Sequence, residues 1–305
     1  MIWLGIAFGL VAAFLQSLCY VVSGSYVRRT GRPGWTLTAP QRALTLVPYA
    51  LMAWFSRPET LAGEESAVIV GTTGCMVMVF LGDAGLFQMQ KTVEPSRVAP
   101  LQSVKIPIIA LISFLLLGHR YSVGQLAGIV LVLASAAVLF GAGRRLGPST
   151  FLWLAACSVG FACSDVSLGH MLVHTRGVCG GVFRSAMFTL GMTGLGSAVL
   201  ALPAVAVQAR AHALPSAREC VRYAIPYGAV WLVAMIFLFV CFSLSGVVLG
   251  TIAQSTRGLI SVALGWFLAR HGFADLERGV SASMFVRRAI AAILVMLAMA
   301  LYAAA

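Results

Sequence analysis

The stretch Gln-Ser-Val-Lys at residues 102–105 lies in the middle of an apolar run, residues 93–118, that is long enough to cross a membrane. A charge at the centre of a bilayer costs at least ~2.5–3.5 kcal/mol, so Lys105 points to a function. The same pattern, Gln-Ser-Thr-Arg, recurs 152 positions later at residues 254–257, inside another apolar run. This offset is half of the chain. It indicates an internal duplication in which each half brings one cation, Lys105 or Arg257, to the middle of the membrane.

The composition predicts a polytopic membrane protein. Of the 305 residues, 60% are hydrophobic and 10% are charged, against roughly 25% charged in soluble proteins. The net charge of +12 would suit a nucleic-acid partner, but the cations are scattered among short loops, so we expect no nucleic-acid binding. The seven cysteines show no CxxC or metal-type spacing, and we expect reduced thiols, no metal site and no disulfide framework.

The fold class predicted is all-α, with ten transmembrane helices. A membrane-spanning helix needs about 20 apolar residues. Ten runs qualify, at residues 2–27, 38–56, 66–90, 94–118, 121–142, 149–173, 178–205, 221–244, 246–269 and 285–304. The basic, glycine-containing segment at residues 144–147 is the natural linker between two five-helix repeats, which we place at residues 1–146 and 147–305.

The distribution of basic residues predicts the orientation of the chain. The loops that follow odd-numbered runs hold thirteen Lys and Arg residues, whereas the opposite side holds three. Because positive charge is retained in the cytoplasm, the odd-numbered loops are predicted to be cytoplasmic and both termini outside. Five helices per repeat is an odd number, so the repeats must insert in opposite senses. Many secondary transporters have this plan, with the substrate site between the repeats at the midplane.

Two helical hairpins carry a resemblance to a known family. The first runs from residue 99 through Pro107 to Gly118 and continues with Ser122, Gln125, Gly128 and Leu131. The second runs from residue 255 to residue 267 and continues with Phe285, Arg287, Arg288 and residues 294–296.

Both hairpins resemble the fourth and fifth helices of the repeats in the drug/metabolite transporter superfamily, in particular its EamA-type ten-helix carriers. One departure is Gly118-His119, where that family often has Gly-Glu. The resemblance implies cytoplasmic termini for many relatives, opposite to the charge bias, which we follow here. Organic-phosphate antiporters of the superfamily look similar at Lys105 and Arg257, since they also place basic residues on the fourth and ninth helices.

Four further charges lie within the apolar runs at matching depths. Arg42 and Asp83 both fall in the third of the membrane nearest the odd-numbered loops. Arg184 and Asp165 both fall in the opposite third. We predict that each pair forms an ion pair, because an unpaired buried charge is far more costly than a paired one.

This pairing leaves Lys105 and Arg257 without a counter-ion in the membrane. Gln102 and Gln254 each precede their cation by three residues, so each amide is expected to share a helix face with its cation. Two cations and two amides from opposite repeats predict a binding site for an anionic group. The alternative is that Lys105 pairs with Asp83 or Asp165 and serves assembly alone.

We therefore predict a multi-pass inner-membrane secondary transporter that moves a small anionic or zwitterionic metabolite, such as an organic phosphate or carboxylate, by alternating access. Substrate binding is assigned to Lys105, Arg257, Gln102 and Gln254. Gating is assigned to the pairs Arg42–Asp83 and Arg184–Asp165, with Asp83 as the first candidate for proton coupling.

Two other functions stay open at this point. One is a proton-coupled exporter of amino acids or cationic drugs that binds the substrate amine at Asp83 and Asp165. The other is a flippase for a phosphate-bearing lipid. No hydrolase, kinase or redox motif stands in a suitable context, so we expect no enzyme, no catalytic residue and no cofactor. The expected partners are a small-molecule substrate, membrane lipid and coupling protons.

Overall fold

The computed structural model describes residues 1–61, 63–91, 93, 98, 101–140, 147–270 and 282–305. All regular elements within these residues are helices, which confirms the all-α prediction. The predicted linker between the repeats, residues 144–147, lies outside them except for Gly147.

Five segments are long and apolar enough to cross a membrane. They are α1 (Ile2–Thr30), α4 (Glu65–Gln90), α8 (Pro148–Val178), α9 (Val182–Arg210) and the continuous segment Ala217–Ser245, which comprises α10 (Ala217–Glu219), η2 (Cys220–Ala224) and α11 (Ile225–Ser245). The other described helices are shorter or broken, so a count of ten spanning helices stays a prediction. They are α2 (Trp35–Leu44), α3 (Leu46–Phe55), η1 (Gln102–Val104), α6 (Lys105–Leu117), α7 (Val123–Phe140), α12 (Val247–Ser255), α13 (Arg257–Arg270) and α14 (Ala282–Ala304).

Three of the predicted runs are interrupted in the middle. Proline accounts for two of the breaks, because Pro48 has no N–H for the carbonyl of Leu44 and Pro107 has none for the carbonyl of Ser103. These breaks separate α2 from α3 and η1 from α6.

The third break separates α12 from α13 at Thr256. Here Ser255 and Thr256 donate their hydroxyls to the carbonyls of Ile252 and Ala253, at 2.6 and 2.7 Å. Such side-chain bonds compete with the helical ladder. As a result Lys105 and Arg257, the duplicated cations, each stand at the first residue of a helix that follows a break.

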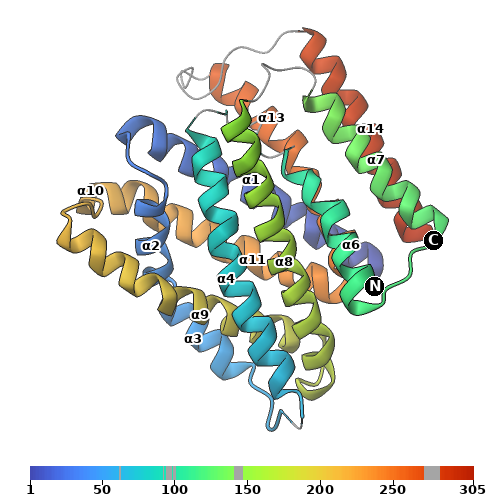
Figure 1. Cartoon of the computed structure of the whole chain (residues 1–305), viewed down its shortest axis with the longest axis horizontal. Coiled ribbons are helices and arrows are strands. Elements are labelled where there is room, and N and C mark those ends of the chain that lie inside the picture. The colour runs from blue at the N-terminus through green and yellow to red at the C-terminus, as the bar shows by residue number, and fades with distance from the viewer. Residues whose placement is uncertain (62, 92, 94–97, 99–100, 141–146, 271–281) are drawn as a thin grey trace.

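The helices pack in pairs. Helix α4 lies along α8, α1 along α11, α7 along α14, and α2 and α3 against α9. In Figure 1, α7 and α14 form one flank of the molecule and α2, α3 and α9 form the opposite flank, with α1, α4, α8 and α11 between them.

Small residues bring the backbones of α4 and α8 into contact. A Cβ atom placed on Gly160 would lie 2.5 Å from the backbone nitrogen of Gly82. One placed on Gly85 would lie 2.6 Å from the carbonyl oxygen of Trp153. Close approach of this kind is how helices associate where lipid removes the hydrophobic drive.

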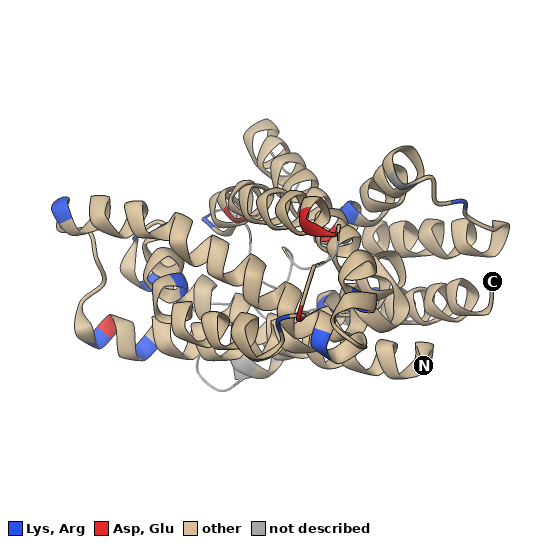
Figure 2. Ribbon diagram, turned by 90° about the horizontal axis from the view of Figure 1, so that it is seen from below, with Lys and Arg blue, Asp and Glu red and all other residues tan. Residues whose placement is uncertain are grey.

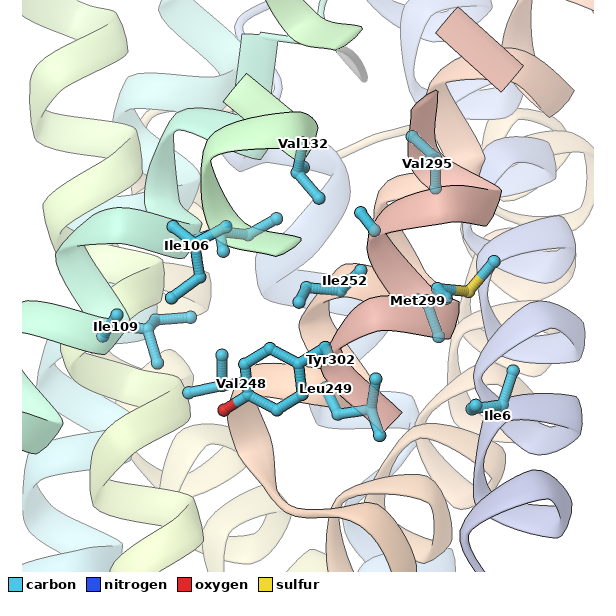
Figure 3. Close-up of a cluster of buried hydrophobic side chains, with 14 of the residues drawn as sticks. Ile6, Ile106, Ile109, Val132, Val248, Leu249, Ile252, Val295, Met299 and Tyr302 are labelled. Atoms are coloured by element: carbon cyan, nitrogen blue, oxygen red, sulfur yellow. The ribbon is translucent and has the colours of Figure 1, made fainter. Parts of the chain in front are cut away.

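A buried apolar cluster joins α1, α6, α7, α12 and α14 around the end of the broken helices (Figure 3). The members labelled in Figure 3 are Ile6, Ile106, Ile109, Val132, Val248, Leu249, Ile252, Val295, Met299 and Tyr302. Figure 2 shows that few positions along the ribbon are charged, because most of it is neither blue (Lys, Arg) nor red (Asp, Glu). The few buried charges therefore stand out against an apolar interior.

Candidate functional site

A cavity of about 820 Å³ of empty space, part of it open, lies among the helices of both halves of the chain. Six of the eight residues predicted for binding or gating line it, namely Arg42, Gln102, Lys105, Asp165, Gln254 and Arg257. Asp83 lines a neighbouring cavity, and Arg184 lines neither.

Lys105 is paired, contrary to the prediction that it lacks a counter-ion. Its Nζ donates to Asp165 Oδ2 at 2.6 Å and to Gln254 Oε1 at 2.9 Å. Both partners of the ion pair are buried, with 4% of the Lys105 side chain and 12% of the Asp165 side chain exposed.

The predicted Arg184–Asp165 pair is wrong. Arg184 is exposed, and its guanidinium donates to the carbonyl of Arg57 at 3.2 Å. The reason is the position of two helix ends. Helix α8 extends to Val178, which puts Asp165 about 20 Å from that end, and α9 begins only at Val182, which puts Arg184 about 3 Å from its start.

Arg257 is buried without a carboxylate partner. Its Nη1 donates to Gln16 Oε1 at 3.0 Å, and its guanidinium lies 5.6 Å from the centre of the Tyr20 ring. In the part of the chain that the structure describes, no carboxylate oxygen lies within 4.0 Å of it. Its Nε is buried with no hydrogen-bond partner.

A chain of hydrogen bonds joins the two cations through two amides. Gln254 accepts from Lys105 and donates its Nε2 to Gln16 Oε1 at 2.7 Å. Gln16 therefore accepts from both Gln254 and Arg257. Each side chain in this chain comes from a different helix, so the arrangement depends on the packing of α1, α6, α8, α12 and α13.

Neither amide bonds to the cation three residues later, although all four residues line the central cavity. Gln254 bonds to Lys105 of the other half of the chain, and Gln102 Oε1 accepts from the hydroxyl of Tyr20 at 2.6 Å. The face relation at a spacing of three holds for a continuous helix, and both helices break between the amide and the cation. Gln16 and Tyr20 were missed, although two polar groups one turn apart in an apolar run were a usable signal.

The predicted ion pair between Arg42 and Asp83 is confirmed. The Arg42 Nη2 donates to Asp83 Oδ2, and the guanidinium lies 4.1 Å from the centre of the Phe80 ring. Arg42 lines the central cavity, whereas Asp83 lines a second cavity with Trp35 and Lys91. The pair therefore stands between two cavities.

The unpartnered polar atoms on the wall of the central cavity are all donors. They are Gln41 Nε2, Arg42 Nη1 and Arg257 Nε, each buried without a partner among the described residues. Buried polar groups in folded proteins are almost always hydrogen-bonded, so these three call for acceptor atoms from a ligand or from water.

Comparisons with known proteins found one family match for the sequence and similar solved structures for the fold. Residues 3–141 match the EamA-like transporter family, which confirms the resemblance over that part of the chain. A solved structure described only as "Crystal structure of protein" has a TM-score of 0.63 and 21% sequence identity, over 97% of this chain and 95% of its own. At this identity the likeness concerns the fold. No curated protein matches the sequence.

Proposed function

Since this chain is a multi-pass membrane protein whose residues 3–141 match the EamA-like transporter family, we propose that it is a secondary transporter for a small anionic or zwitterionic metabolite. The central cavity is the substrate site. The observation that carries the proposal is Arg257, a buried guanidinium on the cavity wall with an unpartnered Nε and no carboxylate nearby among the described residues.

The charge balance at the cavity favours an anion. Arg42, Lys105 and Arg257 contribute three positive charges, and Asp83 and Asp165 take up two of them in ion pairs. The remaining positive charge is that of Arg257. A guanidinium binds carboxylate or phosphate through two parallel hydrogen bonds, and a substrate of this kind would satisfy the open Nε.

The packing of the helices supports the proposed inverted repeats at residues 1–146 and 147–305. Advancing each helix by half of the chain converts the pair α1–α11 into the pair α8–α4, and both pairs are present. The same operation exchanges α7 with α14, and it exchanges α2 and α3 with α9. These helices also pack on one another, so both contacts are unchanged by the operation. Such symmetry is expected of a carrier whose two repeats are related by a pseudo-two-fold axis in the plane of the membrane.

The amine-exporter alternative has less support, because Asp83 and Asp165 already hold cations of the protein. A substrate amine would have to displace Arg42 or Lys105 from a buried carboxylate. The flippase alternative requires the same anion chemistry, and it differs only in whether the phosphate belongs to a lipid or to a soluble metabolite.

The test is uptake into proteoliposomes from a panel of succinate, lactate, glycerol 3-phosphate and choline. Arg257→Ala should abolish uptake of the anion that the wild-type protein carries, and Arg257→Lys should retain part of it, because the charge remains and the fork is lost. Arg184→Gln removes an exposed arginine and serves as the matched control, with uptake within twofold of the wild type.

Three results would overturn the proposal. The first is uptake of choline alone, which would favour the amine exporter. The second is unchanged anion uptake by Arg257→Ala. The third is transbilayer movement of a fluorescent phospholipid with no uptake of the soluble anions, which would identify a flippase.

A further inference from the structure

Asp165 is the only carboxylate among the described residues that line the central cavity. It lies 2.6 Å from the Nζ of Lys105, which also donates to Gln254. Through Gln254 and Gln16, the ion pair is connected to Arg257. A solute that reaches Arg257 therefore also comes close to Lys105 and to the negative charge of Asp165.

The number of charges on the solute decides what Asp165 must do. The empty site holds Lys105 and Arg257 against Asp165, which leaves one positive charge. A monovalent anion neutralises that charge, and Asp165 stays ionised. A divalent anion brings a total of three negative charges against two cations, and an unmatched charge in a buried site is strongly unfavourable.

The excess negative charge is removed most simply by a proton on Asp165. The other titratable groups on the cavity wall are Arg42, Lys105 and Arg257, which already carry their protons, and the thiol of Cys75 and the phenols of Tyr20 and Tyr49, which are ordinarily protonated at neutral pH. Asp83 lies behind Arg42 and lines the neighbouring cavity.

We propose that the cavity takes up a divalent anion together with one proton, and that Asp165 receives the proton as the anion engages Lys105 and Arg257. This inference rests on the proposed function, since it names the coupling ion of the same site. The proton comes from the surrounding water and forms an O–H bond on the carboxylate of Asp165. The Nζ of Lys105 keeps its three hydrogens and turns from the carboxylate to the anion.

The protonation state of Asp165 then follows the charge of the bound solute. A dicarboxylate or phosphate monoester is carried with one proton, whereas a monocarboxylate is carried with none. The two modes use the same cations and differ only at Asp165.

The experiment measures the protons taken up on binding to the purified, detergent-solubilised protein. Isothermal titrations with succinate, glycerol 3-phosphate and lactate are run at pH 7.5 in two buffers that differ in ionisation enthalpy. We expect about one proton per succinate or glycerol 3-phosphate and about none per lactate. Asp165→Asn should bind the divalent anions with no proton uptake, whereas the exposed control Arg184→Gln should keep an uptake of about one.

The outcomes distinguish failure of the anion-transporter function from failure of proton coupling at Asp165. If none of the three anions binds, the anion-transporter function fails and this inference fails with it. Binding of a divalent anion without proton uptake, or proton uptake that persists in Asp165→Asn or disappears in Arg184→Gln, overturns the coupling alone.

A measurement on the wild-type protein covers the case in which Asp165→Asn does not fold. The affinity for succinate should rise about tenfold for each pH unit lowered between pH 8 and 7, while that for lactate stays constant, because one proton is linked to binding of the divalent anion only. Equal pH dependence for both anions would overturn the proposal.

Discussion

The two duplicated cations, Lys105 and Arg257, have different partners because different side chains face them. Lys105 of α6 meets Asp165 of α8, and Arg257 of α13 meets α1, the helix that corresponds to α8 in the other half. By the 152-residue offset, the position in α1 that corresponds to Asp165 is Ala13. The carboxylate is present in one half and absent in the other. Lys105 is therefore paired with a carboxylate, whereas Arg257 bonds to an amide.

The ion pair between Arg42 and Asp83 yields a prediction at the residue scale. Removing either partner alone, by Arg42→Ala or Asp83→Ala, leaves a buried charge unpaired and should cost about 3–5 kcal/mol of stability. The double variant should lose clearly less than the sum of the two single losses. Thermal unfolding of the detergent-solubilised variants measures these differences, and additive losses would contradict a coupled pair.

Breaks in helices decide the direction in which the functional side chains point. Pro107 and the turn at Thr256 place Lys105 and Arg257 at helix starts, each directly after a break. Gln102 and Gln254 bond to Tyr20 and Lys105, and not to the cation three residues later. By contrast, α4 and α8 are unbroken, and their glycines let the two backbones come into contact.

The glycine contact between α4 and α8 yields a prediction at the scale of the element. Gly160→Ala forces a Cβ to within 2.5 Å of the backbone of Gly82 and should destabilise the protein by about 1–3 kcal/mol through overpacking. Gly177→Ala lies on the same helix with no atom within 4 Å of the new Cβ. That variant should be neutral or more stable by up to about 1 kcal/mol, because alanine favours the helix.

Melting temperatures of the two variants, measured side by side, test this contrast. Equal effects of Gly160→Ala and Gly177→Ala would mean that helix propensity, and not contact between α4 and α8, decides the stability at these positions.

At the scale of the molecule, three cavities follow the length of α1. Ser245, which packs beside Gly5 near the start of α1, lines one cavity together with His119 and Tyr302. Gln16 in the middle of α1 lines the central cavity. Gly34, just after the end of α1, lines the third cavity with Asp83. Along α1, the central cavity therefore lies between the other two.

The orientation of the molecule in the membrane is the prediction at this scale. The bias of Lys and Arg toward the odd-numbered loops predicts that Ala211, after α9, faces the cytoplasm and that Arg120, before α7, faces outward. In a background without native cysteines, a membrane-impermeant maleimide should label Arg120→Cys but not Ala211→Cys in intact cells. The opposite labelling would give the cytoplasmic termini that the family resemblance implies.

Much of this architecture could be predicted from the sequence because it depends on local properties. The length of an apolar run indicates a helix that suits a membrane, and the depth of Arg42 and Asp83 in their runs was enough to pair them correctly. The pair Arg184–Asp165 failed by the same reasoning, since the ends of α8 and α9 were misplaced by a few residues and depth is measured from helix ends.

By itself the sequence determined the helical membrane class, the repeated cations and the residues available to the site. Only the tertiary structure decided that Lys105 is neutralised by Asp165, that Arg257 is left with Gln16, and that Gln254 serves the cation of the other half. These partners are far apart in the chain. Which of them meet depends on how broken helices cross and rotate against one another, and packing over the whole bundle sets that geometry.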